Sequence, residues 1–447
     1  MNIELRNMKY TMINKYVIYL VMFVCTAVPV FRQQYGYADE TLAWEDCVTI
    51  AEQNHPDLQK AKAQIDKSRA VKGSTTSGYL PQVSINAGVE RGEKTYSSGD
   101  FGTNSGVEKN TYSYGISGNQ LIFDGMKSVY DIKSSGSALQ EARFQYMAVS
   151  SAVRYNLRIA FIMVLKAQEE KRILEDIVEI RKKNYEFVQM RYKAGREHMG
   201  ALLKSRANLL NAEFEKKRAE RNHAVYRKQL AVRMGMKKGP MLDVNGVIAI
   251  GEKMENRPDF ESVVKSNPNL LALTMQREAA EYSAKAALSG LSPQINAYGS
   301  YGKSDSSWPP ENTQWYVGVK ATYPLFEGGN SYYKYKKAAA EEKAAAAGLV
   351  STENDLVLSL EQKWNDLENK NQLIAVRKEF LKAAEERSKI ASSQYNLGLV
   401  MYDNWIIIED ELVNTKKQLL EARTDAMAAE AEWLYARGVT LKDGNQE

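Results

Sequence analysis

The stretch LPQV at residues 80–83 recurs as SPQI at 292–295, and this recurrence is the first sign of an internal repeat. A motif with asparagine and proline precedes each copy, as NHPDL at 54–58 and as NPNL at 267–270. Pro56 and Pro268 are 212 residues apart, and so are Pro81 and Pro293. A fixed period between matching motifs indicates a duplicated structural unit.

The duplication continues along the chain with an offset of 203 residues. FDG at 123–125 matches FEG at 326–328, YKAG at 192–195 matches YNLG at 395–398, and Gly235 matches Gly438. The offset changes between Pro81 and Phe123, where the first copy has a longer polar loop. We therefore predict two tandem repeats, 39–238 and 257–440, with an inter-repeat linker at 239–256 and a C-terminal tail at 441–447.

Residues after the second proline of each copy alternate between apolar and polar side chains, which is the period of a half-buried β-strand. The apolar positions are Val83, Ile85, Ala87 and Val89 in the first copy and Trp315, Val317, Val319 and Ala321 in the second. Loops rich in Gly, Ser, Asn and Asp separate the alternating segments. The pattern predicts one β-hairpin at about 82–123 and another at about 294–326.

A long helical tract follows each hairpin. Residues 126–192 contain no proline, and about 67 residues at 1.5 Å each reach roughly 100 Å. Large apolar residues at Val153, Leu157, Phe161 and Val164 recur 203 residues later as Leu356, Leu360, Trp364 and Leu367. This narrow stripe predicts coiled-coil packing. Each tract is predicted to end in a turn, at 192–198 or 395–400, from which a second helix returns.

The N-terminal segment has the layout of a secretory signal peptide, predicted at 1–38. Lys9 and Lys15 precede an apolar run at 16–30, and GYA at 36–38 offers a cleavage site. The run is shorter than the roughly 20 residues of a spanning helix, although a retained anchor or lipidation at Cys25 are alternatives. Cleavage removes four basic residues and one acidic residue, so the net charge falls from +5 to +2 and gives no indication of nucleic-acid binding.

The residues that carry catalysis or metal binding do not occur in recognisable patterns. The three histidines, His55, His198 and His223, have no metal-ligand spacing, and we expect them on the solvated surface. Cys47 is predicted to be a small buried residue. No nucleophile motif or phosphate-binding loop is present, so we expect no catalytic residue, cofactor or metal site.

Two hairpins cannot close a barrel within one chain. In a bilayer their unpaired edges would face hydrocarbon, which does not satisfy backbone hydrogen bonds. Strands from several subunits would then have to complete the barrel. The alternative on patterning alone is a pair of soluble hairpins packed on helices.

These motifs together resemble those of the TolC-like outer membrane efflux family. The resemblance rests on LPQ at 80–82, NPNL at 267–270, PLFEGG at 324–329 and YNLGL at 395–399, and it covers about 41–440. It implies an α+β membrane protein that forms a homotrimer, with a twelve-stranded outer-membrane β-barrel continued by a periplasmic α-helical barrel. It also implies a passive exit duct of a tripartite efflux or type I secretion system, which docks to a periplasmic adaptor and an inner-membrane transporter of the RND, ABC or MFS type.

The resemblance also implies positions for functional residues. The periplasmic tips that dock the adaptor would contain Tyr192, Gly195, Tyr395, Gly398 and Leu399. The family often places an aspartate six residues after the tip glycine, but these positions are Ala201 and Asn404 here. The candidates for the entrance constriction are therefore Asp403, Asn404 and Glu409. The candidates for the barrel lumen are Ser117, Lys320 and Thr322.

The competing function is a non-conducting periplasmic coiled-coil adaptor or tether. Adaptors have one helical hairpin flanked by small β-domains. This chain instead repeats a strand pair with its helices in full, which favours the channel. A soluble enzyme has no candidate site to support it.

Overall fold

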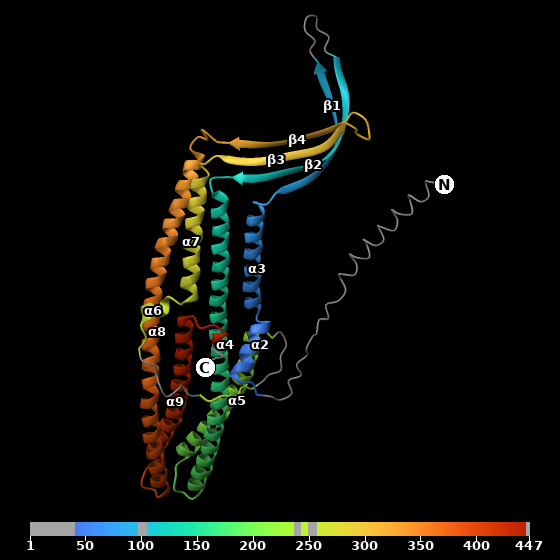
Figure 1. Ribbon diagram of the computed structural model, residues 1–447. Coiled ribbons are helices and arrows are strands. Elements are labelled where there is room, and N and C mark those ends of the chain that lie inside the picture. The colour runs from blue at the N-terminus through green and yellow to red at the C-terminus, as the bar shows by residue number, and fades with distance from the viewer. Residues whose placement is uncertain (1–40, 97–104, 237–242, 249–256, 444–447) are drawn as a thin grey trace, which may run out of the picture. The chain divides into compact units, whose positions relative to one another are not determined.

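The computed structural model describes residues 41–96, 105–236, 243–248 and 257–443 (Figure 1). The predicted signal peptide, part of the predicted linker and the last four residues lie outside the described residues. The first repeat contains α2 (Trp44–Asn54), α3 (Pro56–Ser77), β1 (Gln82–Tyr96), β2 (Ser105–Phe123), α4 (Lys127–Lys193) and α5 (Met199–Arg233). The second contains α6 (Phe260–Val264), α7 (Pro268–Ser289), β3 (Gln294–Asp305), β4 (Thr313–Thr322), α8 (Asn330–Asn396) and α9 (Tyr402–Arg437).

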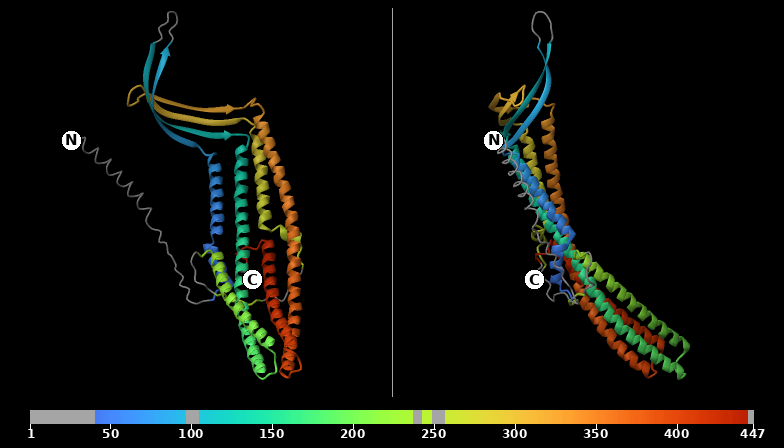
Figure 2. Two further views of the ribbon diagram at one scale, coloured as in Figure 1. Left: turned by 180° about the vertical axis from the view of Figure 1, so that it is seen from behind. Right: turned by 90° about the vertical axis from the view of Figure 1, so that its right-hand side faces the viewer.

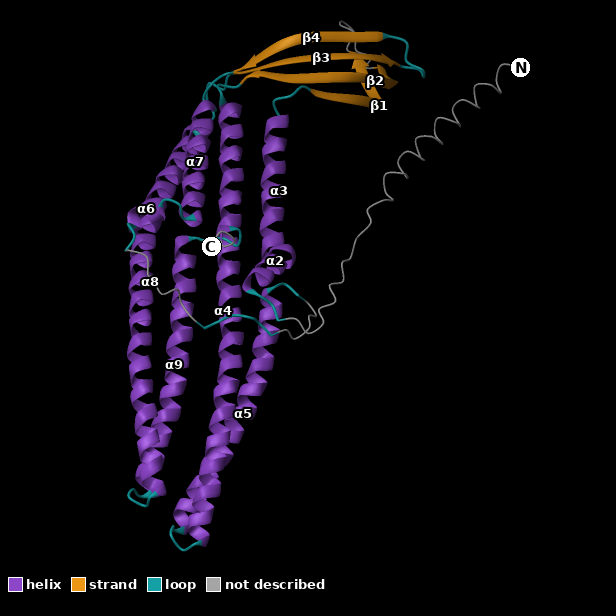
Figure 3. Ribbon diagram, turned by 60° about the horizontal axis from the view of Figure 1, so that its bottom comes forward, coloured by secondary structure: helices purple, strands orange, loops and turns teal. Residues whose placement is uncertain are grey.

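The four strands form one antiparallel sheet in the order β1-β2-β3-β4, at one end of the helices (Figure 3). Ile85 lies opposite Ile116, which lies opposite Tyr301 in the next strand. Because partners in register share a face, the apolar positions of all four strands gather on one side of the sheet. The second face carries the polar positions, among them Ser84, Asn86, Ser117, Asn296, Ser300, Lys320 and Thr322.

The second hairpin ends earlier than the sequence pattern indicated. β4 stops at Thr322, whereas the hairpin was predicted to reach about residue 326. Pro324 has no N–H to donate to a ladder, which explains the early end. Gly328 and Gly329 then adopt positive φ angles and lead into α8.

The helices form two antiparallel pairs that continue from the sheet (Figures 1 and 2). Near the sheet α3, α4, α7 and α8 pack in that order, and further away α5 lies against α4 and α9 against α8. All four predicted stripe residues of α4 are buried, as are three of the four in α8. Among the described helices, α4 alone is long and apolar enough to cross a bilayer. Its contacts with α5, α7 and α9 show that it is instead the core helix of the bundle.

The shorter helices join end to end. At the end of α5, a Cβ on Gly235 would lie 2.6 Å from the backbone oxygen of Asn54, just before α3. At the end of α9, a Cβ on Gly438 would lie 2.3 Å from Pro268 Cδ, at the start of α7. Both glycines have φ near +80°, at +79° and +82°, a conformation that residues with a side chain rarely adopt. The glycine match found in the sequence therefore marks two equivalent helix junctions.

The described parts of the linker and tail pack against the helices. Leu42 bridges in parallel to Val244, and the Gln168 side chain in α4 donates to the Val244 carbonyl at 3.3 Å. Leu441, predicted to begin a tail, is buried, and its N–H donates to Ser150 Oγ at 3.2 Å. The described residues on both sides of the predicted boundaries thus belong to the folded unit.

Candidate functional site

The predicted lumen residues come together on the polar face of the sheet. Ser117 lies opposite Ser84 and Ser300, and its Oγ is 2.8 Å from Ser84 Oγ. Lys320 and Thr322 point from the same face of β4 and are exposed. This face therefore combines hydroxyl, amide and ammonium groups, which suit contact with water.

The opposite face exposes apolar side chains along all four strands. Ile85 in β1 is 84% exposed and Val317 in β4 is 82% exposed. Tyr301 and Trp315 lie opposite each other on this face and are exposed as well. A continuous apolar surface of this kind marks a contact with a membrane or a partner. A sheet with one apolar and one polar face is typical of the wall of a membrane β-barrel.

The two helical tips have the same backbone structure. In the first tip, the Gly195 N–H donates to the Tyr192 carbonyl and the Arg196 N–H to the Arg191 carbonyl, both at 2.9 Å. The second tip repeats both bonds from Gly398 and Leu399. This is the Schellman arrangement, which ends a helix with a left-handed residue. Gly195 and Gly398 supply that residue, with φ of +69° and +76°.

Tyr395 holds the second tip to the first. Its ring stacks on Trp405 with a centroid distance of 4.3 Å, and its hydroxyl donates to Glu197 at 2.8 Å. Arg191 donates to the Tyr395 carbonyl at 3.1 Å. Burial, with the hydrogen bond to Glu197, raises the pKa of Tyr395. This corrects its predicted role on the docking surface, because the side chain is only 1% exposed.

The other predicted tip residues remain on the surface. Tyr192, which takes the place of Tyr395 in the first repeat, is partly exposed, and Leu399 is largely exposed. Gly195 and Gly398 lie at the turns themselves. These residues are therefore available to a partner, whereas Tyr395 is not.

The predicted entrance residues divide into two groups. Asp403 and Asn404 are exposed in the first turn of α9. Glu409 is only 4% exposed and accepts hydrogen bonds from Ser388 Oγ at 2.5 Å and Ser392 Oγ at 3.2 Å. Its carboxylate is enclosed between α8 and α9, which corrects its placement among residues that face the entrance.

Sequence reasoning missed an ion pair that joins the two helical pairs. Arg181 in α4 is buried, and its Nη2 lies 2.5 Å from Asp410 Oδ1 in α9. Arg181 falls on the buried stripe of α4, between Ile177 and Val188. A cation on an apolar stripe was the available signal, because such a charge requires a partner.

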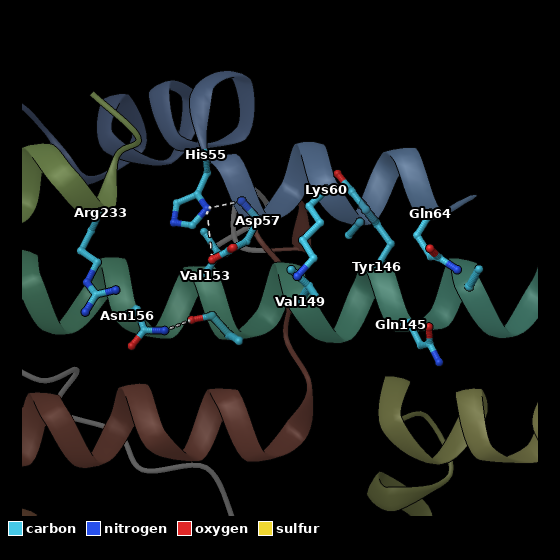
Figure 4. Close-up of a pocket in the computed structure, with 13 residues that line it drawn as sticks. His55, Asp57, Lys60, Gln64, Gln145, Tyr146, Val149, Val153, Asn156 and Arg233 are labelled. Carbon is cyan, nitrogen blue, oxygen red and sulfur yellow. Dashed lines mark hydrogen bonds and ion pairs between the residues drawn. The ribbon is translucent and has the colours of Figure 1, made fainter. Parts of the chain in front are cut away.

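A cavity of about 400 Å³ lies beside the junction of α5 with α3 (Figure 4). His55, Asp57, Lys60 and Arg233 contribute to its lining, and His55 Nδ1 accepts a hydrogen bond from the Asp57 N–H at 3.2 Å. At the second junction Asn267 replaces His55 and donates to the Ala436 carbonyl at 2.8 Å. The cavity extends from this junction along the contact between α3 and α4.

Two histidines predicted on the surface are buried. Burial lowers the pKa of His55 and of His223. His223 Nε2 lies 2.9 Å from Asp243 Oδ1, in the described part of the linker. His198 is exposed, as predicted, and its Nδ1 accepts from the Ala201 N–H at 3.2 Å. In the part of the chain that the structure describes, no group of His, Cys, Asp and Glu side chains has the arrangement of a metal site.

The sequence profile described as outer membrane efflux protein matches residues 48–235 and 261–436, which are the two structural repeats. The chain belongs to the outer membrane efflux protein family. Two curated relatives are the outer membrane efflux protein BepC of Brucella suis and the outer membrane protein TolC of Vibrio cholerae. BepC is 21% identical over 411 residues, covering 88% of this chain and 84% of the relative. TolC is 20% identical over 386 residues, covering 84% and 86%.

Solved structures share the fold. The outer membrane channel CmeC of Campylobacter jejuni superposes with a TM-score of 0.79 at 17% identity, covering 88% of this chain and 85% of that one. The family assignment identifies this chain as part of an exit duct in the outer membrane, and the sheet with one apolar and one polar face is consistent with it. The family is one of channels rather than of enzymes.

Proposed function

We propose that three copies of this chain close one twelve-stranded barrel and that their helices continue as a tube into the periplasm. The observation that carries this proposal is the sheet, which has an exposed apolar face, a polar face and two unpaired edges, β1 and β4. Unpaired edges are not tolerated in hydrocarbon. A closed ring of subunits pairs every edge, with the apolar face outward and the polar face around water.

Conduction through this duct is passive and uses no catalytic residue. The proposed lumen wall includes Ser117, Lys320 and Thr322, whose side chains bias which ions pass. At the far end, the Arg181–Asp410 ion pair and the Tyr395–Glu197 hydrogen bond hold neighbouring helical pairs together. We propose that these contacts keep the periplasmic end narrow until a partner binds.

The tips are the proposed docking site for a periplasmic adaptor. Both tips expose large apolar side chains in water: Met190, Met199 and Leu203 in the first and Leu397, Leu399 and Met401 in the second. Exposed apolar patches of this kind favour a protein partner. The adaptor would connect the duct to an inner-membrane transporter of the RND, ABC or MFS type, and the transporter would set the cargo.

The test is to purify the full chain from outer-membrane fractions, measure its native mass and record conductance in planar bilayers. We expect trimers that form water-filled channels. Replacing Val319 on the apolar face by glutamate should prevent membrane insertion, whereas Lys320→Gln should preserve it. Recovery of the chain only as a monomer from the soluble periplasm would contradict the proposal.

A further inference from the structure

We infer that β4 of one subunit pairs with β1 of the next in one specific register, with Val319 opposite Val89 and Lys320 opposite Gly88. This inference rests on the proposed trimer and deepens it. It names the residues that meet where two subunits join, which is called the subunit seam below. The sequence repeat and the three strand pairings inside one chain together define this register.

The repeat offsets preserve strand register inside the chain. In the β1–β2 pair, Gln82 lies opposite Asn119. Adding 212 to the first number and 203 to the second gives Gln294 and Thr322, which are opposite each other in the β3–β4 pair. The offsets came from prolines, glycines and aromatic residues outside this comparison, so the agreement is an independent check.

The same offsets convert the β2–β3 pairing into the pairing at the subunit seam. There β4 takes the place of β2, and β1 of the next subunit takes the place of β3. Ile116 lies opposite Tyr301, and their equivalents are Val319 and Val89. Ser117 lies opposite Ser300, and their equivalents are Lys320 and Gly88.

The resulting pairs match in chemistry on both faces. Val319 and Val89 are both exposed apolar residues on the face assigned to lipid, and Ala321 would lie opposite Ala87. On the polar face Thr322 would lie opposite Asn86. A slip of one residue would bring the polar face of one strand beside the apolar face of its neighbour, which a membrane sheet does not tolerate.

The register also brings opposite charges together in the lumen. Glu90 would be the diagonal neighbour of Lys320 across the seam, a separation that long side chains can bridge. Both residues are exposed on the polar face. Within the described part of the chain, neither makes an ion pair. Across the seam, Lys320 of one subunit and Glu90 of the next would form an ion pair.

The turns that follow β2 and β4 also differ in whether a neighbouring segment covers them. Gly125 has a φ of +69°, and a Cβ there would lie 2.3 Å from Ser292 Cβ. Its equivalent Gly328 has a φ of +62° but no neighbour within 4 Å. At the offset of 212, the residue equivalent to Ser292 is Leu80, which is exposed just before β1. Leu80 of the next subunit would fill the space beside Gly328.

Exposure of the matching phenylalanines points to the same missing neighbour. Phe123 in the first repeat is 41% exposed, because the second repeat covers part of it, whereas Phe326 is 90% exposed. A second copy of the chain is the occupant that supplies an equivalent covering surface. Head-to-tail pairing of β4 with β1 also closes a ring, as a heterologous interface must to remain finite.

Disulfide trapping in the full-length outer-membrane protein tests the register. Two double variants are made, Val319→Cys with Val89→Cys and Lys320→Cys with Gly88→Cys. One face of an antiparallel ladder holds the non-hydrogen-bonded pairs, whose side chains approach more closely, so at least one variant has suitable geometry. Oxidation should lock three seams and convert the chain to a covalent trimer on a non-reducing denaturing gel.

The controls separate register from proximity. Val319→Cys combined with Ala87→Cys or with Arg91→Cys shifts the pair by two residues and should cross-link less. Single variants should give no covalent trimer. In one chain β1 and β4 are three strand spacings apart, about 14 Å at roughly 4.8 Å each, which is beyond disulfide reach. Cys47 is buried, and burial raises the pKa of its thiol to about 12, so it does not compete.

The outcomes distinguish the register from the trimer. Preferred cross-linking of a shifted pair overturns the inferred register. Failure of all pairs in a protein that still has the native mass of a trimer overturns the β4–β1 seam while leaving the trimer intact. A native mass of one chain contradicts the proposed function as well as the inference.

Discussion

The two repeats share a backbone but differ in the side chains that hold their tips. Gly195 and Gly398 end their long helices with the same two hydrogen bonds. The Arg181–Asp410 ion pair, in contrast, has Ala384 and Ala207 at the equivalent positions. The charged pair joins α4 to α9 within a subunit. At the equivalent positions Ala207 is exposed on α5 and Ala384 is buried in α8, so neither can form an ion pair with a neighbouring subunit.

This difference indicates where the periplasmic end is held closed. Inside a subunit, the two tips share the ion pair, an edge-to-face contact between Phe187 and Tyr395, and the Tyr395–Glu197 hydrogen bond. Trp405 in the second tip corresponds to Leu202 in the first, and Tyr402 corresponds to Met199. We therefore expect opening to separate tips across subunit boundaries before it separates tips within a subunit.

The largest loss of stability is expected from substitutions at the helix junctions. Gly438→Ala combines left-handed strain of about 1–2 kcal/mol with a collision against Pro268 Cδ at 2.3 Å. Gly195→Ala carries the same strain at φ +69° but meets nothing within 4 Å. Gly438→Ala should therefore lower the melting temperature and trimer yield much more. Equal losses would show that the contact with Pro268 contributes nothing.

Loss of the aromatic contact at the second tip should cause the second-largest loss of stability. Trp405→Ala removes a buried ring that is only 4% exposed, for which a loss of about 3–5 kcal/mol is typical. The matched variant Leu202→Ala removes a partly buried side chain and should cost less. Limited proteolysis at the tips measures the difference. Faster cleavage in Leu202→Ala than in Trp405→Ala would contradict the expectation that Trp405 stabilises its tip more than Leu202 does.

The ion pair should have a smaller effect on stability and a clear effect on conductance. Asp410→Ala leaves buried Arg181 without its partner, and because Asp410 is half exposed we expect a cost of about 2 kcal/mol, below that of a fully buried pair. Looser tips should increase conductance in planar bilayers. Glu421→Ala, which removes an exposed acidic residue on the same helix but away from the tip, is the control. Unchanged conductance in Asp410→Ala would remove this pair from the closing contacts.

The smallest effect is a pH dependence from His223. Burial lowers the pKa of this histidine in the folded protein, so the unfolded chain binds more protons once the pH falls below the ordinary value of about 6.5. Stability is therefore complete above that value and declines on acidification towards the folded pKa. His223→Gln should flatten the plot of melting temperature against pH between 7.5 and 5. His198→Gln, at an exposed site, should not.

Much of the architecture was predictable because periodic patterns report local structure. Alternation gave the strands, and the repeated glycines gave the helix ends. The faces of the sheet followed as well, so Ser117, Lys320 and Thr322 were placed on one face before their register was known. This was possible because alternation within one strand shows which side chains share a face, without knowledge of the strand it pairs with.

The tip contacts were not predictable, because they join residues about two hundred positions apart. Tyr395 was assigned to the docking surface from its position in a motif, but Glu197 and Arg191 of the first repeat hold it in a buried site. Glu409 was proposed as a source of negative charge at the entrance, but α8 and α9 of its own repeat enclose its carboxylate. Neither the pattern nor the spacing states which helix covers which side chain. His223 was misassigned for the same reason, since Asp243 reaches it from the linker.

The most direct test of the central claim is to modify cysteines on the two sheet faces in single channels. Lys320→Cys and Val319→Cys are adjacent on β4, and a charged, water-soluble thiol reagent is added during recording. The reagent should change the conductance of Lys320→Cys and leave that of Val319→Cys unchanged, because the side chain at position 320 faces water and the one at position 319 faces lipid. Modification of Val319→Cys with no response from Lys320→Cys would contradict this expectation.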